Sequence, residues 1–177
     1  MRREPRGYAA PSANCRVMSA ADRTHATNGG LMSTQRSDAQ GNTVLSIDAM
    51  GGDHGPGAVV AGLAKAAAQN ERLRFILHGR EADLRPLVTR KRGLSEICEI
   101  RDAPDVVTMD AKPSHVMRNG KGSSMWSTVE AVRAGEASVA LSCGNTGALM
   151  AVSMLRLRKI EGVNRPAIAC LWPSRAA

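Results

Sequence analysis

The clearest fold signal lies in Thr43–His78, TVLSIDAMGGDHGPGAVVAGLAKAAAQNERLRFILH. Its first seven residues, TVLSIDA, are typical of a short strand, and the Gly- and Pro-rich run MGGDHGPG that follows indicates a turn. AVVAGLAKAAAQ over 58–69 predicts a helix, and LRFILH over 73–78 predicts a second strand. A strand, a helix and a strand in this order predict a right-handed crossover between parallel strands.

The same alternation continues along the chain. Further helices are expected over 81–90, 124–134 and 147–158, and further strands over 96–101, 138–142 and 166–171. Several of the strands are apolar on both faces, as strands covered by helices on both sides are. The sequence therefore predicts an α/β layered domain with a mainly parallel sheet.

The first 42 residues have a different composition. Residues 1–42 are rich in Arg, Ser, Ala, Asn, Thr, Gln and Gly, and they hold no sustained hydrophobic period. Such a composition cannot offset the entropy lost on ordering, so we expect a flexible N-terminal extension. A mis-assigned start codon is the open alternative, because Met18 and Met32 lie inside this segment. Residues 43–177 are expected to form the folded domain.

Composition and charge narrow the class of protein. The chain has 177 residues, of which 43% are hydrophobic and only four are aromatic, so its core must be built from small and aliphatic side chains. No apolar run approaches the roughly 20 residues that a membrane span needs, and no apolar segment of a secretory signal follows the N-terminal arginines. We therefore expect a soluble, cytoplasmic protein.

The chain is strongly basic, with a formal net charge of +8. Its densest cluster, Arg90-Lys91-Arg92, falls where a predicted helix ends, where cations complement the helix dipole. No aromatic residues are interleaved with the basic ones to stack on bases. The distribution argues against nucleic acid and favours a small anion or an acidic protein partner.

The cysteines and histidines predict no metal site. Both residue types are scattered along the chain without metal-binding spacing, so we expect reduced thiols, no metal and no cofactor. Cys143 precedes a predicted helix, and a helix N-terminus favours a thiolate. A nucleophilic role and a packing role for Cys143 both stay open.

A glycine-rich turn follows the first predicted strand, at the edge where α/β folds bind ligands. In DAMGGDHGP (48–56), Gly51 and Gly52 permit close backbone approach, and Asp48 and Asp53 flank the turn. The alternative is a tight turn in which Asp53 caps the next helix.

Two further segments have the composition of anion-binding loops. In SCGNTG (142–147), a strand leads into a helix whose first amide groups can bind phosphate, with Asn145 and Thr146 as donors or as the helix cap. KPSHVMRNGKGSSM (112–125) suits a hinged loop that contacts an anion, or a solvated linker whose last serines cap a helix.

Four motifs together resemble one known family. DAMGGDHGP, KPSHVMRNGKGSSM, SCGNTGALM and EGVNRPAIA occur in this order with compatible spacing over about residues 43–172. They resemble the bacterial phosphate acyltransferases of phospholipid synthesis (acyl-ACP:phosphate acyltransferases). The resemblance implies an isopropylmalate-dehydrogenase-like α/β fold and usually a homodimer. It also implies that inorganic phosphate attacks the thioester of a long-chain acyl group on acyl carrier protein (ACP), which yields acyl phosphate.

The resemblance suggests a role for each candidate residue. Asp48, Asp53 and Asn145 are the candidate catalytic residues, and the choice of general base stays open. The candidate phosphate-binding residues are Gly51, Gly52, Arg118, Lys121, Ser123, Ser124, Gly144, Thr146 and Gly147. The implied partners are acyl carrier protein, inorganic phosphate and a second copy of the chain, with peripheral membrane contact left open and nucleic acid not expected.

The chain departs from the family pattern in two ways. The family commonly has a small apolar residue where this chain has Cys143, which argues against an essential nucleophile. The family also continues for about as much chain again, so we expect this chain to be its N-terminal portion. The alternatives are a non-catalytic fragment that binds phosphate or ACP, and a short-chain phosphate acetyltransferase that uses acyl-coenzyme A.

Overall fold

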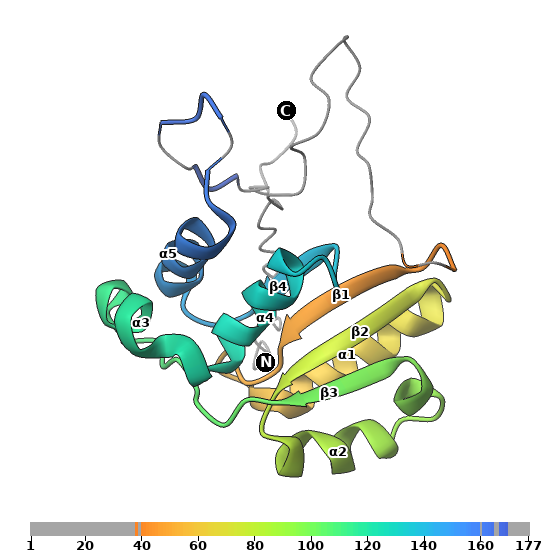
Figure 1. Cartoon of the computed structure of the whole chain (residues 1–177). Helices are drawn as coiled ribbons and strands as arrows, with labels where there is room; N and C mark the ends of the chain where they lie inside the picture. Colours follow the sequence, from red (N-terminus) through yellow and green to blue (C-terminus); the bar gives the residue numbers. More distant parts are fainter. Residues whose placement is uncertain (1–37, 39, 160, 165–166, 170–177) are drawn as a thin grey trace, which may run out of the picture.

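One parallel sheet forms the centre of the molecule. The computed structural model describes residues 38, 40–159, 161–164 and 167–169. The strands are β1 (Thr43–Asp48), β2 (Leu73–Gly79), β3 (Cys98–Asp102) and β4 (Val139–Ser142). They lie in the order β3-β2-β1-β4, and every pairing is parallel (Figure 1). The predicted layered α/β fold with a mainly parallel sheet is confirmed.

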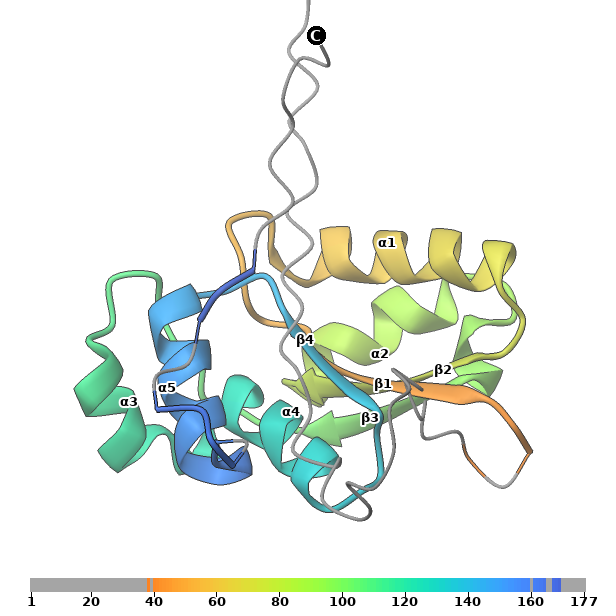
Figure 2. The ribbon, with the colours of Figure 1, turned by 90° about the horizontal axis from the view of Figure 1, so that it is seen from above.

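Helices lie on both sides of this sheet. Helices α1 (Gly55–Gln69) and α2 (Glu81–Thr89) lie on one side, and α3 (Pro113–Asn119), α4 (Ser124–Arg133) and α5 (Thr146–Leu157) lie on the other (Figure 2). Two 3-10 turns precede β3 and α4, at Leu94–Glu96 and Gly120–Gly122. Among the described residues, no helix has the length and apolar character needed to cross a membrane.

The two faces of the sheet have different chemistry. Strand side chains alternate between faces, and Ile47, Phe75 and Leu77 pack in the apolar cluster with α1 and α2. The face toward α4 carries Ile76 and Ala140 in a second apolar cluster. Near the carboxyl ends of the strands this second face becomes polar. The buried polar residues there are Ser46, Asp48, His78 and Ser142.

The predicted loop over 112–125 is wrong in part, because α3 occupies Pro113–Asn119. Pro113 stands at the first position of the helix, where its fixed φ and missing N–H are tolerated, and Val116 is buried against the core. One apolar side chain facing inward is enough to dock this short helix. Gly120 and Gly122, the glycines expected to supply a hinge, bound a 3-10 turn, and the hinge stays a prediction.

Elements differ from expectation by more than one residue at three places. Helix α1 begins at Gly55, before the expected residue 58, because Pro56 fits the first helical turn. Strand β3 begins at Cys98, because a 3-10 turn takes up Leu94–Glu96. Of the strand expected over 166–171, residues 167–169 form no strand and Ile168 is 54% exposed; the remaining residues lie outside the described part.

The predicted N-terminal extension lies almost entirely outside the described residues. Its described end forms a turn in which the Asp38 carboxylate accepts from the amide groups of Gln40 (2.9 Å) and Asn42 (2.7 Å). This turn leads directly into β1. The extension over 1–42 stays a prediction.

His78 is a fully buried polar residue between β2 and α4. Ser46 Oγ lies 2.8 Å from its Nε2, and Ser127 Oγ lies 2.7 Å from its Nδ1. The Ser46 hydroxyl donates its only proton to the Thr128 carbonyl oxygen (2.9 Å), so it must accept from Nε2. His78 is therefore the neutral tautomer with its proton on Nε2, and its Nδ1 accepts from Ser127. Burial, and secondarily the Arg101 guanidinium, lower the pKa of His78 to about 4.

This lowered pKa predicts a pH-dependent free energy of unfolding. Because the pKa of His78 is 6.5 when unfolded and about 4 when folded, the unfolded state binds more protons between these values. The free energy of unfolding therefore decreases as the pH is lowered through that window. The shift corresponds to about 3 kcal/mol. Urea denaturation between about pH 7 and about pH 4 measures it.

The variant His78→Met should lose this part of the slope of stability against pH. The control His115→Gln, at an exposed histidine on α3, should keep it. An equal slope in His78→Met and the original chain would contradict the assignment.

Candidate functional site

The Asp48 carboxylate lies at the end of β1 and joins three elements. The residue is 2% exposed. Its Oδ1 accepts from Ser124 Oγ (2.6 Å) and from the Met50 amide (3.2 Å), and its Oδ2 accepts from Ser142 Oγ (2.7 Å). One carboxylate therefore connects the carboxyl ends of β1 and β4 to the first residue of α4.

The two glycine-rich turns meet beside this carboxylate. A Cβ atom on Gly51 would lie 2.7 Å from Asp48 Oδ2 and 2.9 Å from the Gly144 nitrogen, so no side chain fits there. Gly52 has a φ of +97°, and a Cβ on it would lie 3.0 Å from that of Cys143. The Gly144 amide donates to Ser142 Oγ (3.0 Å). Glycine at 51 and 52 is thus required by backbone approach and by a left-handed backbone.

Asn145 connects the start of α5 to the loop between β3 and α3. Its Oδ1 accepts from the Ala148 amide (3.0 Å), which caps the helix. Its Nδ2 donates to the carbonyl oxygens of Met109 and Ala111, both at 2.9 Å. Both ends of this amide are engaged by the chain's own backbone. The cap that the sequence indicates is present, and a catalytic role for Asn145 stays a prediction.

The serines at the start of α4 have separate functions. Ser123 is the N-cap: its Oγ accepts from the Trp126 amide (3.2 Å) and donates to the Gly120 carbonyl oxygen (2.7 Å). Ser124 is buried and donates to Asp48. Only Ser124 therefore belongs to the group around the carboxylate.

The remaining predicted residues lie at the surface or near it. Asp53 and Thr146 are exposed at the turns, Gly147 is half-buried with Pro113 close by, and Arg118 and Lys121 are exposed on α3 and on the turn after it. Within the described part of the chain, no hydrogen bond or ion pair joins Arg118 or Lys121 to Asp48. The structure brings together Asp48, Gly51, Gly52, Ser124 and Gly144, and it leaves the two cations on a neighbouring surface.

Sequence reasoning missed two residues of this edge. Ser142 is the second donor to Asp48, and its position two residues after Ala140, at the end of a strand, is the signal that could have identified it. The Asp105 carbonyl oxygen accepts from the Ser124 amide (3.0 Å). Asp105 lies in an irregular loop, where no periodic signal exists.

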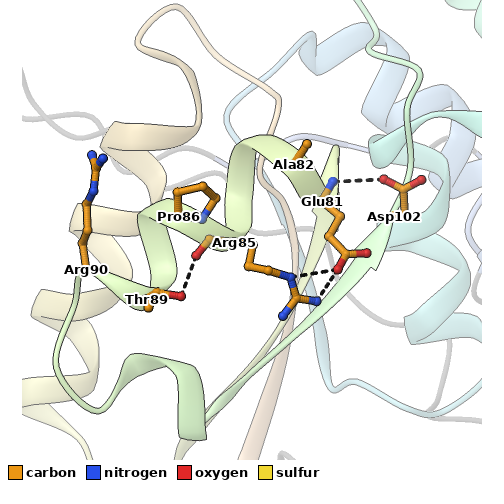
Figure 3. Close-up of a pocket in the computed structure, with 7 residues that line it drawn as sticks. All are labelled: Glu81, Ala82, Arg85, Pro86, Thr89, Arg90 and Asp102. Atoms are coloured by element: carbon orange, nitrogen blue, oxygen red, sulfur yellow. Dashed lines mark hydrogen bonds and ion pairs between the residues drawn. The ribbon is translucent and has the colours of Figure 1, made fainter.

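A separate open groove runs along α2 and does not belong to this site. It has a volume of about 740 Å³ and is lined by Glu81, Ala82, Arg85, Pro86, Thr89, Arg90 and Asp102 (Figure 3). Most of its polar groups bond to one another. Asp102 accepts from the Glu81 amide (3.0 Å), Arg85 pairs with Glu81, and Thr89 donates to the Arg85 carbonyl oxygen (2.9 Å). The groove thus offers few free polar groups to a ligand.

Comparison with known proteins gives one consistent result. A family model described as "Fatty acid synthesis protein" matches residues 43–177. Proteins named "Phosphate acyltransferase" from Jannaschia sp. (strain CCS1) and Ruegeria sp. (strain TM1040) are 74% identical over 138 residues and 63% identical over 146 residues. These alignments cover 78% and 82% of this chain but 38% and 39% of the two relatives, so the chain spans less than two fifths of their length.

The close contact at Gly51 predicts that Gly51→Ala is destabilising. The added methyl group would collide with Asp48 Oδ2 and the Gly144 backbone, so we expect a loss of about 1–3 kcal/mol in the free energy of unfolding. The control is Gly62→Ala in α1, where an added Cβ would meet no atom within 4 Å apart from the neighbouring backbone of its own helix; it should be neutral or stabilising by up to about 1 kcal/mol. Urea denaturation measures both, and equal stabilities would show that the contact is absent.

Two variants separate the two functions of Asn145. Asn145→Asp keeps the oxygen that caps α5 but cannot donate to the carbonyl oxygens of Met109 and Ala111, whereas Asn145→Ala loses both. Amide hydrogen exchange should therefore accelerate over residues 106–111 in both variants. In the first turn of α5 it should accelerate only in Asn145→Ala, which we expect to lose about 1–2 kcal/mol of stability. If residues 106–111 exchanged as slowly in Asn145→Asp as in the original chain, the hydrogen bonds from Asn145 would not hold this loop in place.

Proposed function

The chain belongs to the fatty acid synthesis protein family, and we propose that it supplies the phosphate-binding part of a phosphate acyltransferase that makes acyl phosphate for phospholipid synthesis. The observation that supports this most directly is the meeting of two glycine turns and the start of α5 beside Asp48. Backbone amide groups at a helix start, next to glycine turns, are a common way to bind phosphate.

The proposed reaction joins phosphate to an acyl group without a covalent enzyme intermediate. An oxygen of inorganic phosphate attacks the carbonyl carbon of a long-chain acyl thioester on acyl carrier protein. The new C–O bond forms as the C–S bond breaks, and the carrier thiolate leaves and takes up a proton. Positioning is the main requirement, because phosphate is already a competent nucleophile.

The environments of the two carboxylates suggest different roles for them. Asp48 is buried and bonded to two hydroxyls, so we assign it the role of holding the turns in place. Asp53 is exposed at the end of the glycine turn and is the carboxylate that can reach a bound phosphate or accept its proton. The exposed Cys143 needs no nucleophilic role in this scheme.

The exposed cations supply the attraction for anions. Arg118 and Lys121 would neutralise phosphate, and the net charge of +8 would attract an acidic carrier protein. Because the Gly144 amide already donates to Ser142 Oγ, the amide groups of residues 145–147 would hold phosphate or the oxyanion that forms at the thioester. A homodimer remains a prediction of the family resemblance, and a cytoplasmic location remains a prediction of the sequence composition.

The proposal is tested by an assay for acyl phosphate on the purified chain and on a longer protein that contains it. The substrates are phosphate with long-chain acyl-ACP or with short-chain acyl-coenzyme A. We expect acyl phosphate from acyl-ACP. Turnover with acyl-coenzyme A alone would favour a short-chain phosphate acetyltransferase, and phosphate binding without turnover in either protein would favour a binding fragment.

A charge variant tests the phosphate-binding role. Arg118→Ala should raise the KM for phosphate about tenfold with a smaller change in kcat, because a cation next to phosphate acts mainly through binding. The matched control is Arg72→Ala. Arg72 is an exposed arginine just before β2, at the amino-terminal ends of the strands and so away from the proposed site. Equal phosphate KM values in the two variants would remove Arg118 from the proposed site.

A further inference from the structure

We propose that His78 is a positioning residue for the site at Asp48. By connecting Ser46 of β1 to Ser127 of α4, it holds α4 in one register on the sheet and so keeps the Ser124 hydroxyl on Asp48. The inference rests on the proposed function in one respect only, which is that phosphate binding serves as one of its measurements.

The contacts form one continuous polar seam between the sheet and α4. Ser124, Ser127 and Thr128 are spaced so that they lie on the same side of the helix. Ser124 donates to Asp48, Ser127 bonds to His78, and the Thr128 carbonyl oxygen accepts from Ser46. On the sheet, Asp48 and His78 are paired neighbours on β1 and β2. The two residues therefore act on the same helix from adjacent strands.

The seam permits one placement of α4 along the sheet. Ser46, His78 and Thr128 are all fully buried, so their polar atoms depend on partners within the protein. A shift of the helix by a fraction of a turn would leave a buried donor or acceptor unpaired, which is costly. Apolar contacts alone tolerate such shifts, because they have no direction. His78 thus makes the position of Ser124 specific.

His78 acts through other residues and does not touch substrate. His78 and Ser46 are both 0% exposed, which excludes the use of this serine and histidine as a nucleophile and base on a thioester. Their bonds run toward α4, and the effect on the site passes through Ser124. A positioning role is the one that this geometry allows.

The charged groups around His78 come from three elements. Asp48 lies beside it on β1, Arg101 and Glu99 lie on β3, and Glu136 follows α4 and pairs with Arg101. On α4 itself, the carboxylate of Glu130 pairs with Arg133 and with Arg156 of α5. Protonation of His78 would put a donor on Nδ1 and break the bond in which Ser127 donates to it.

The experiment compares the half-buried Ser127 with the buried Ser153 by substitution to alanine. Ser127→Ala removes the partner of His78 Nδ1. Ser153→Ala, on α5, is the matched control, because the hydroxyl of Ser153 is buried and has no hydrogen-bond partner among the described residues. His78→Asn is a third variant, because its side-chain oxygen can take the place of Nδ1 and accept from Ser127.

Three measurements on the whole chain decide the proposal. Nitrogen NMR of the imidazole should report the proton on Nε2. Amide exchange at Ser124 and Met125 should accelerate about tenfold in Ser127→Ala, less in His78→Asn and not in Ser153→Ala. The dissociation constant for inorganic phosphate should increase about three- to tenfold in Ser127→Ala and stay unchanged in Ser153→Ala.

Each contrary result has a distinct meaning. A proton on Nδ1, or equal exchange at Ser124 in the two serine variants, would overturn the positioning role. Faster exchange with unchanged phosphate affinity would also overturn it, because the helix would then be anchored without effect on the site. Should the original chain bind no phosphate, the proposed function fails, while the tautomer and the exchange rates still decide whether His78 sets the position of Ser124.

Discussion

The two hydroxyl groups that donate to the Asp48 carboxylate are the constraint on which the rest of the structure depends. Ser142 comes from β4 and Ser124 from α4, so one buried side chain sets the relative positions of a strand end, a helix start and the turn that leads into α5. A buried carboxylate needs several donors, and the two hydroxyls and the Met50 amide supply them. The small space beside it explains why both neighbouring turns are built from glycine.

The division of the sheet into an apolar and a polar face explains how this site is supported. Below it, Ile47, Phe75 and Leu77 pack with α1 and α2 and provide the nonspecific part of the stability. Above it, the directional hydrogen bonds of the polar seam fix the position of α4 along the sheet. Helix α5 is joined to α4 by the pair of Arg156 with Glu130 and by the contact of Arg156 with the Trp126 ring, 5.3 Å from its centroid. Contacts near both ends of α5, those of Arg156 and those of Asn145, therefore fix the position of this helix.

Much of this could be predicted from the sequence because the signals are local. Alternating strands and helices, and glycines after strands, identified the fold and the turns at 51–52 and 144. Two features depend on contacts between distant residues and left no local signal: the hydrogen bonds from Asn145 to the loop at 109–111, and the bond of His78 across 49 residues to Ser127. The strand period places Ser142 on the same face as Ala140, but its bond to Asp48, 94 residues away, has no local signal. Helix α3 was missed because a single buried valine docks it.

Phosphate should bind where the two glycine turns meet beside Asp48, and the decisive measurement is a titration of the chain with inorganic phosphate, followed by amide NMR. We expect saturable chemical-shift changes at Gly51, Gly52 and Gly144–Ala148, with the groove residues Glu81 and Arg85 unaffected. Changes confined to the α2 groove, or linear drift at all amide groups without saturation, would contradict it.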